Sequence, residues 1–369
     1  MHKLFILLIL VLASGCAALK QPATEKAYPL TLFNPPPINS YKDIDRNALR
    51  NSIITNLSYL EGAGKGRIFN YGGRIVTAEE VVKTQRTFLQ IIDNAVSDEM
   101  LEILMKDFFE WYQASGVDGN GTVVFTGYYV PVIDGSVYPS EKYRYPVYKA
   151  PFDLKKDVPY YTREEIDGKK VLKGRGLEVA WLSDPVEVYF LQIQGSGIIK
   201  LPDGAAVGVH YAGNNGQAYK SIGKMMIEQG IISQNEGSLE GIKRFFRNHP
   251  DIVDKILFQN PRYIFFEINN SPAKGSLKVA LTPGHSIATD PDLFPRGGLS
   301  LITTKTPVVD SSGRVSDYNK VQRFVLNQDE GGAIKGPGRV DIFWGTGPDA
   351  GLKAGYMKEK GNLYFLLQK

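Results

Sequence analysis

The residues with the clearest chemical potential lie in a glycine-rich segment, 329–347, whose sequence is DEGGAIKGPGRVDIFWGTG. The segment ends in the mostly apolar stretch 340–347, in which Asp341 is the only charged residue. On a strand, Asp341 and Phe343 would share one face, because side chains alternate. The opposite face would carry the apolar residues Val340, Ile342 and Trp344. Apolar surroundings raise the pKa of a carboxyl, which suits a general acid. The same pattern also fits an aspartate that only binds amides of the glycine-rich loop, so both interpretations stay open.

Three further segments combine hydroxyls, amides and aromatic rings: 125–129 (FTGYY), 190–197 (FLQIQGSG) and 211–219 (YAGNNGQAY). Gln192 and Gln194 alternate with apolar residues, which predicts a strand with both amides on one face. Such side chains suit a neutral sugar polymer, because rings cover sugar C–H faces and amides bind hydroxyls. Clusters of glycine with Asn or Ser are also common in plain turns. The candidate glycan-binding residues are Thr126, Gly127, Tyr128, Gln192, Gln194, Gly195, Ser196 and Asn215.

The N-terminal residues predict export and a lipid anchor. A basic start precedes the apolar run 4–13, which is shorter than the roughly 20 residues that a membrane-spanning helix needs. It has the length of a signal-peptide core, and residues 13–16 (ASGC) resemble the lipobox of bacterial lipoproteins. We therefore expect a signal peptide over 1–15, lipidation of Cys16 and a proline-rich tether over 16–40. Ala17, where an aspartate would favour the inner membrane, predicts the periplasmic face of the outer membrane. The alternative is an ordinary secretory signal with an incidental cysteine.

The composition argues against several functional classes. Cys16 is the single cysteine and the four histidines are scattered, so neither disulfides nor a metal site is expected. The net charge of +4 comes without a dense basic stripe, which argues against nucleic-acid binding. No cofactor motif is evident. The length allows two domains.

The expected elements change from helical to β along the chain. Thr77 opens a capping box with Glu80, and Ser97 is expected to cap a second helix. Leu101, Leu104, Phe108 and Trp111 would share one face of that second helix. Short strands are expected from Val123 onward, with helices over 217–228 and from Ser238, and a strand over 261–267. The last hundred residues are expected to form strands and turns, with strands over 277–281, 299–303, 321–326, 340–344 and 363–367.

Taken together and in this order, QIQGSG, YAGNNGQAY and GGAIKGP…DIFWGTGP resemble the membrane-bound lytic transglycosylase A family of murein-cleaving lipoproteins. The resemblance implies a mainly β fold with N-terminal helices. A double-psi β-barrel domain would comprise 41–129 and 269–369, and a smaller β-barrel domain would be inserted over 130–268, with a groove between them. The C-terminal part resembles the family's "3D" domain, named for three aspartates, which by position are Asp290, Asp329 and Asp341. Asp341 would be catalytic, with Asp329 and Asp290 in supporting roles.

The resemblance further implies cleavage of peptidoglycan glycan strands between N-acetylmuramic acid and N-acetylglucosamine, with 1,6-anhydromuramic acid ends as product. No cofactor is implied, and the partners are the glycan strand and the membrane; no particular protein partner is indicated. Two alternatives remain at this stage. A hydrolase would need a second carboxylate, for which Glu330, Glu187 and Asp184 are candidates. A non-catalytic barrel would bind peptidoglycan without cutting it.

Overall fold

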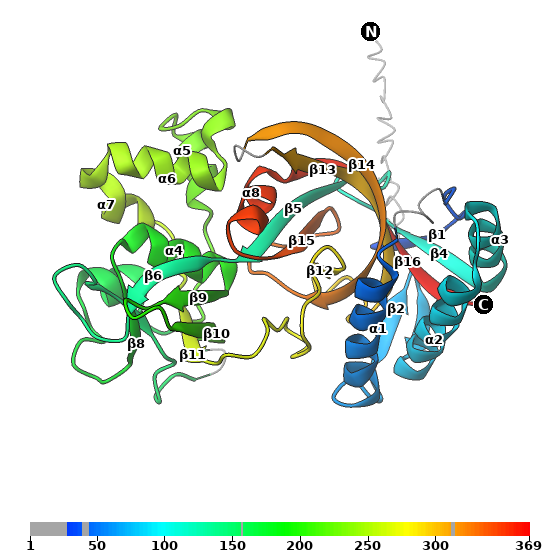
Figure 1. The fold of residues 1–369 in the computed structure, drawn as a ribbon, viewed down its shortest axis with the longest axis horizontal. Helices are drawn as coiled ribbons and strands as arrows, with labels where there is room; N and C mark the ends of the chain where they lie inside the picture. The colour runs from blue at the N-terminus through cyan, green and yellow to red at the C-terminus, as the bar shows by residue number, and fades with distance from the viewer. Residues whose placement is uncertain (1–27, 39–43, 156–157, 311–313) are drawn as a thin grey trace, which may run out of the picture.

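The computed structural model describes residues 28–38, 44–155, 158–310 and 314–369, which form two β-sheet domains side by side (Figure 1). Cys16 and the predicted signal peptide lie outside the described residues. Within the described part of the chain, no helix is both long and apolar enough to cross a membrane.

The first domain is built on a closed barrel. Its strands are β5 (Val123–Val130), β12 (Ser286–Ala288), β13 (Leu299–Val309), β14 (Val315–Asp329), β15 (Arg339–Thr346) and β16 (Lys358–Gln368). Neighbours pair in the order β16–β13–β14–β12–β15–β5, and β5 pairs back with β16, so the ring closes. The pairs β12–β14 and β15–β5 are parallel, while the others are antiparallel. The predicted barrel is thereby confirmed.

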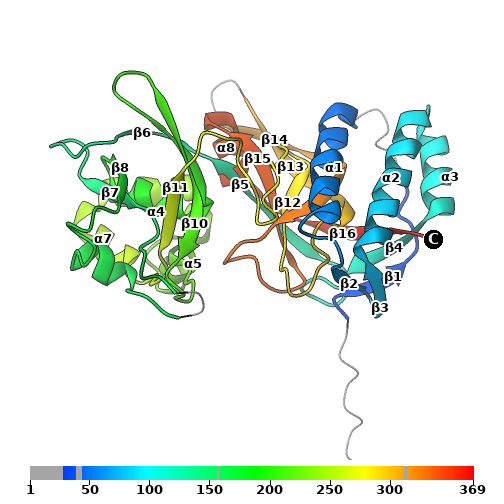
Figure 2. The same cartoon turned by 90° about the horizontal axis from the view of Figure 1, so that it is seen from below.

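Helices cover the side of the barrel that faces away from the second domain (Figure 2). They are α1 (Arg46–Glu61), α2 (Ala78–Asn94) and α3 (Asp98–Phe108), with a hairpin of β2 (Ile68–Tyr71) and β3 (Arg74–Thr77). The capping box at α2 is confirmed, because Thr77 accepts from the Glu80 amide and the Glu80 carboxylate accepts from the Thr77 amide. Ser97 caps α3 as predicted. Apolar side chains of α1, α2 and α3 pack against β13 and β14 in a core cluster of their own.

Two predictions at this end of the chain are wrong. Trp111 does not continue the face of α3, because the chain becomes extended at Phe109 and pairs with β16 as β4 (Phe109–Ala114). Phe108 is exposed at the end of the helix. The tether predicted over 16–40 includes strand β1 (Leu30–Phe33), which pairs with β4 and buries Leu30 completely. The proline-rich composition masked this short strand, whose partner lies some eighty residues away in the chain.

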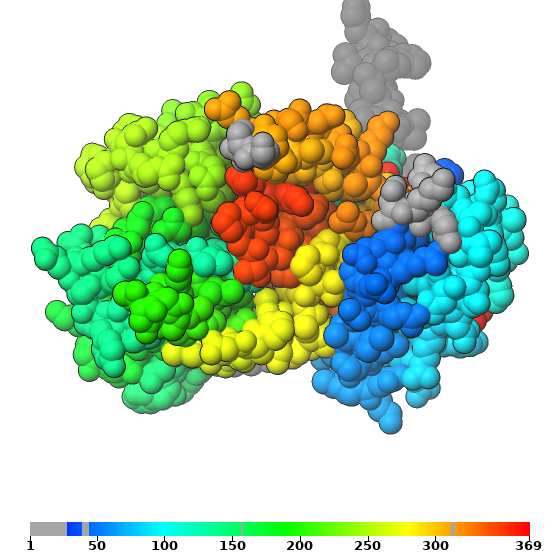
Figure 3. Space-filling model, viewed as in Figure 1, coloured from blue at the N-terminus to red at the C-terminus, as the bar shows by residue number. Residues whose placement is uncertain are grey.

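The second domain contains β6 (Val132–Ser136), β7 (Tyr145–Tyr148), β8 (Glu178–Leu182), β9 (Ser196–Lys200), β10 (Ala206–Asn214) and β11 (Ile264–Ile268). These strands pair in the order β11–β10–β9–β6–β8–β7, and the two edge strands contact each other, so the sheet is strongly curled. The chain enters directly from β5 and leaves after β11 through a segment that crosses one face between the two domains (Figures 1 and 3). The inserted β-domain is therefore confirmed.

Helices pack around this second sheet: α4 (Pro185–Gln194), α5 (Ile222–Glu228), α6 (Leu239–Asn248) and α7 (Val253–Leu257), with a π-helix, η2 (Glu164–Gly168), and the 3-10 turns η3 (Gln234–Glu236) and η4 (Pro250–Ile252). Ser238 caps α6 as predicted. The helix expected over 217–228 begins later, at Ile222, where Ser221 caps it.

The strand predicted over 190–197 is wrong, because most of this segment belongs to α4. Asp184 caps the helix by accepting from the Val186 amide, and Gly195 ends it in the left-handed conformation (φ 77°). The helix lies between two core clusters and is buried on several sides. A helix covered all round lacks the one-sided apolar stripe that reveals a helix in sequence.

The C-terminal region holds two further differences. Strands cover four of the five predicted segments, but 277–281 contributes only to an isolated bridge between Lys274 and Ala280. The helix α8 (Pro348–Tyr356) was not predicted; it follows the site strand β15 and packs on β5 and β15.

Candidate active site

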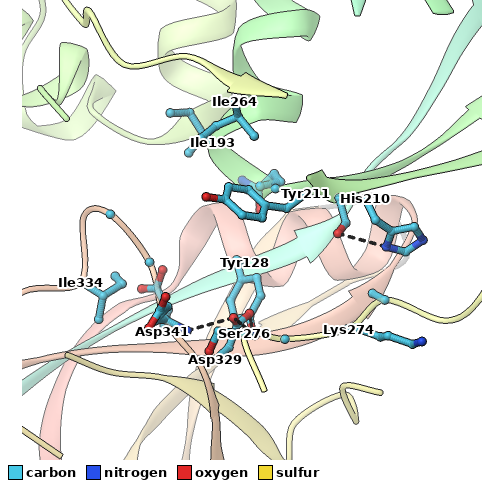
Figure 4. Close-up of a pocket in the computed structure, with 18 of the residues that line it drawn as sticks. Tyr128, Ile193, His210, Tyr211, Ile264, Lys274, Ser276, Asp329, Ile334 and Asp341 are labelled. Carbon is cyan, nitrogen blue, oxygen red and sulfur yellow. Dashed lines mark hydrogen bonds between the residues drawn. The ribbon is translucent and has the colours of Figure 1, made fainter. Parts of the chain in front are cut away.

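A cavity of about 990 Å³ lies between the two domains, with walls from both. The barrel contributes Tyr128, Asp329, Asp341 and Phe343, together with residues 331–335 of the glycine-rich loop. The second domain contributes Gln192, Gln194, Gly195, Ser196, His210 and Tyr211. Figure 4 shows Tyr211, Ile193 and Ile264 on the side opposite Tyr128, Asp329 and Asp341. The predicted groove between the domains is thus present, and the four segments selected from the sequence meet at or near it.

Asp341 lies on β15 between two neighbouring strands. It is in register with Thr126 of β5 and Ala288 of β12. The Thr126 hydroxyl donates a hydrogen bond to its carboxylate. Asp341 and Phe343 line the cavity, while Val340 and Ile342 are buried in the barrel core, so the predicted alternation is confirmed. The hydrogen bond found for Asp341 within the described residues comes from a side chain and not from loop amides, which disfavours the purely structural interpretation.

Burial raises the pKa of Asp341 to about 6, against the opposing effect of the Arg339 guanidinium. The negative charge of Asp329 adds to the increase. A carboxyl with this pKa is protonated in a substantial fraction of molecules near pH 6, so it can supply a proton and then take one back. This is the property that a single acid–base group requires.

Asp329 ends β14 and is held by three donors. The Tyr128 hydroxyl donates to it at 2.8 Å, the Ser276 amide at 2.8 Å and the Glu330 amide at 2.9 Å. Burial nevertheless raises the pKa of Asp329 to about 6. Tyr128 also contacts Phe343, with ring centroids 5.3 Å apart. Asp329 therefore fixes an aromatic wall beside Asp341 and adds a second titrating carboxyl to the cavity.

Asp290 lies near the cavity but is not among the residues that line it. It is buried, accepts from the Gly336 amide at 2.9 Å and binds the Lys335 ammonium at 3.1 Å. Both partners belong to the glycine-rich loop that lines the cavity. Asp290 thus anchors the loop that precedes Asp341 without lining the cavity itself.

Two residues selected from the sequence as glycan ligands serve the fold instead. Asn215 is completely buried, and its side-chain amide donates to the Tyr161 and Pro261 carbonyls while accepting from the Tyr263 amide. Gly127 lies under Trp344, and a Cβ atom there would come within 2.6 Å of the indole ring. Neither lines the cavity, so both are corrected to packing and positioning roles. Thr126, also predicted as a glycan ligand, does not line the cavity either, and its hydroxyl binds the Asp341 carboxylate instead.

Gln192 and Gln194 line the cavity although they lie on a helix. The Gln192 side-chain oxygen accepts from Arg163 at 2.6 Å, and that of Gln194 accepts from the Tyr129 amide at 3.0 Å. The next residues, Gly195 and Ser196, complete this wall, and the Ser196 hydroxyl lies 3.4 Å from Nδ1 of His210.

Several cavity residues were not identified from the sequence. Tyr211 and Tyr219 belong to the segment YAGNNGQAY, so its tyrosines could have been selected together with Asn215. Arg163, His210 and Arg262 carry no local motif. They reach the cavity only through the pairing of distant strands and loops.

The carboxylates proposed for a hydrolytic alternative are mostly elsewhere. Glu187 binds Lys243 at 2.8 Å and Asp184 caps α4, and both line a separate cavity of about 310 Å³. Glu330 does line the main cavity, where it forms an ion pair with Arg296. In the described residues, no cluster of three or more His, Cys, Asp or Glu side chains could hold a metal ion.

The fold and site define a two-domain β-barrel protein with a cleft that holds two aspartates of raised pKa. Residues 124–267 match the MltA specific insert domain and residues 285–367 match the 3D domain. Membrane-bound lytic murein transglycosylase A of Vibrio cholerae is 35% identical over 257 residues, covering 69% of this chain and 68% of that protein. Its Escherichia coli K12 counterpart is 33% identical over 258 residues, with the same shares. The chain therefore belongs to the membrane-bound lytic murein transglycosylase A family.

Solved structures extend the similarity over nearly the whole chain. A membrane-bound lytic murein transglycosylase from Agrobacterium tumefaciens superimposes with a TM-score of 0.73 and 28% identity, covering 90% of this chain and 95% of that one. E. coli MltA with bound chitohexaose superimposes with a TM-score of 0.70 and 27% identity, covering 94% and 97%. The arrangement of a barrel with an inserted domain is thus common to this chain and its relatives.

Proposed function

We propose that the protein is a lytic transglycosylase that cleaves the β-1,4 bond between N-acetylmuramic acid and N-acetylglucosamine in peptidoglycan. The observation that carries the proposal is Asp341, a carboxyl with a pKa of about 6 at the surface of an interdomain cleft. Membership of the transglycosylase family supports the reaction, and the chitohexaose bound to a relative supports a glycan of N-acetylated sugars. The biological role would be turnover of the cell wall.

The mechanism needs one carboxyl and no water. Neutral Asp341 donates its proton to the oxygen that links the two sugars, while the C1–O bond breaks and positive charge develops at C1 of the muramic acid. The resulting carboxylate takes the proton from the C6 hydroxyl of the same sugar as that oxygen bonds to C1. The product is a 1,6-anhydromuramoyl end, and Asp341 is neutral again. General acid–base catalysis of this kind contributes about 10²–10⁴-fold to a rate.

The surrounding residues have distinct proposed roles. Thr126 orients the Asp341 carboxylate through its hydroxyl. Asp329 holds the Tyr128 ring in place and raises the pKa of Asp341 by its charge. Tyr128 offers an aromatic face to a sugar, and Gln192 and Gln194 offer amides from the opposite wall. Asp290 stabilises the loop between Asp329 and Asp341.

Digestion of purified sacculi with the wild-type protein tests this proposal. Mass analysis of the soluble fragments should show 1,6-anhydromuramic acid ends. Reducing muramic acid ends would instead identify a hydrolase, with Glu330 as the carboxylate in the cavity to examine next. Glycan binding without soluble fragments would identify a non-catalytic wall-binding protein.

We further propose that Cys16, outside the described residues, carries a lipid that anchors the protein to the periplasmic face of the outer membrane. The sequence ASGC after an apolar run supports this proposal, as does the membrane-bound character in the relatives' name. Cys16→Ala should abolish metabolic labelling with palmitate and move the protein to the soluble periplasmic fraction. Retention of the variant in the outer-membrane fraction would contradict the anchor.

A further inference from the structure

The amide groups of Gln192 and Gln194 have a fixed polarity at the cavity wall. The group next to Gln192 is the guanidinium of Arg163, 2.6 Å away, and an arginine can only donate. The group next to Gln194 is the backbone N–H of Tyr129, 3.0 Å away, which also can only donate. In each glutamine the atom facing the protein must therefore be the oxygen. Because both residues line the cavity, their NH₂ groups are the polar atoms left to face it, although only 4% of Gln192 is exposed.

Arg163 is itself held rigidly. Its side chain is 2% exposed and also donates to the carbonyls of Asn260 at 3.2 Å and Arg262 at 2.7 Å. The Asp167 carboxylate in the π-helix η2 lies 3.6 Å away and balances the charge. The Arg163 guanidinium also lies over two rings, 4.6 Å from the centroid of Tyr189 and 5.1 Å from that of Tyr263. With these contacts in place, rotation of Gln192 would bring its NH₂ group against donors, which costs a lost hydrogen bond inside the protein.

We propose that Arg163 is a positioning residue that fixes Gln192 as a hydrogen-bond donor toward the cleft, and that Gln192 and Gln194 together select sugars bearing acetamido groups. The inference rests on the proposed function and specifies its substrate class. Sugar hydroxyls both donate and accept, so a fixed donor does not discriminate among them. An acetamido carbonyl only accepts, whereas the ammonium of a de-N-acetylated sugar only donates. A pair of fixed NH₂ donors therefore favours N-acetylated strands and disfavours de-N-acetylated ones.

The first test is Gln192→Glu, with binding measured by calorimetry against chitohexaose and against the fully de-N-acetylated hexamer. The new carboxylate keeps a partner for Arg163 but presents an acceptor to the cleft. Chitohexaose affinity should fall at least about tenfold, and the preference for it over the de-N-acetylated hexamer should shrink. Gln259→Glu is the matched control, because Gln259 is exposed and does not line the cavity. The preference of this variant for chitohexaose over the de-N-acetylated hexamer should equal that of wild type. An unchanged preference in Gln192→Glu would overturn the inference.

The second test separates positioning from folding. Arg163→Lys keeps the charge next to Asp167 but cannot reproduce the forked donors of the guanidinium. It should weaken chitohexaose binding several-fold in the wild-type background and have no further effect in the Gln192→Ala background. Equal losses in both backgrounds would show that Arg163 does not act through Gln192 and would overturn its positioning role. Both measurements are of binding, so they stay informative even if sacculus digestion contradicts the proposed reaction.

Discussion

Replacing Asp341 with asparagine should make the protein more stable at neutral pH while removing its acid–base group. Burial and the charge of Asp329 raise the pKa of Asp341 from 3.8 to about 6 in the folded protein. A rise of about two pKa units corresponds to about 3 kcal/mol. This is the free energy that the folded protein loses when Asp341 carries its charge at neutral pH. Asparagine is nearly isosteric and carries no charge, so the variant avoids this loss.

The sign of the pH dependence follows from linkage. Below pH 3.8 the carboxyl is neutral in both the folded and the unfolded chain, and the variant and wild type should have similar stabilities. Between pH 3.8 and about 6 the unfolded chain ionises while folded Asp341 keeps its proton, so wild-type stability falls relative to the variant as the pH rises. Above pH 7 the difference should reach its plateau of about 3 kcal/mol in favour of Asp341→Asn.

Urea denaturation at pH 4 and pH 8 measures this difference. Asp118→Asn serves as a control of opposite sign, because hydrogen bonds from Thr122 and neighbouring amides lower the pKa of Asp118 to about 2. That variant should be less stable than wild type by similar amounts at pH 4 and pH 8, because the contribution of Asp118 fades only as the pH falls from 3.8 to about 2. If Asp341→Asn has the same stability relative to wild type at both pH values, the raised pKa of Asp341 is refuted.

Two predictions concern the residues reassigned to the fold. Asn215→Ala leaves buried backbone groups without partners and should lower the free energy of unfolding by about 2–4 kcal/mol, measured by urea denaturation; a loss below about 0.5 kcal/mol would contradict its structural role. Gly127→Ala forces a methyl group against Trp344 and should cost about 1–3 kcal/mol, measured by thermal melting beside wild type; an unchanged melting temperature would show that the indole ring moves freely.

The sequence predicted the site strand well because its signals are local. Alternation over 340–344 placed Asp341 and Phe343 on one face, and the structure shows that arrangement. The capping box at Thr77 was predictable for the same reason, since its partners are three residues apart. The barrel and the inserted domain were expected from the family resemblance and not from the strand pattern alone.

The remaining features depend on contacts between distant parts of the chain. The helix α4 was predicted as a strand because it is buried on several sides and therefore lacks a one-sided stripe of apolar residues. Gln192 and Gln194 still line the same cavity, but they do so from a helix and not from one face of a strand. Asn215 was predicted as a ligand because nothing local shows that loop carbonyls at Tyr161 and Pro261 surround it. Arg163 was not selected, since its role appears only when residues 29 and 99 positions away come together.

The central claim is that Asp341 is the single acid and base of a water-independent cleavage. The most direct test is digestion of purified sacculi by Asp341→Asn and wild type at matched concentrations, with release of 1,6-anhydromuropeptides followed by mass analysis. Asparagine can still donate a hydrogen bond, so glycan affinity should remain near that of wild type. It can neither supply a proton to the bridging oxygen nor accept one from the C6 hydroxyl, so release should fall by at least about 10²–10⁴-fold. Wild-type rates of release from a folded Asp341→Asn protein would contradict the account.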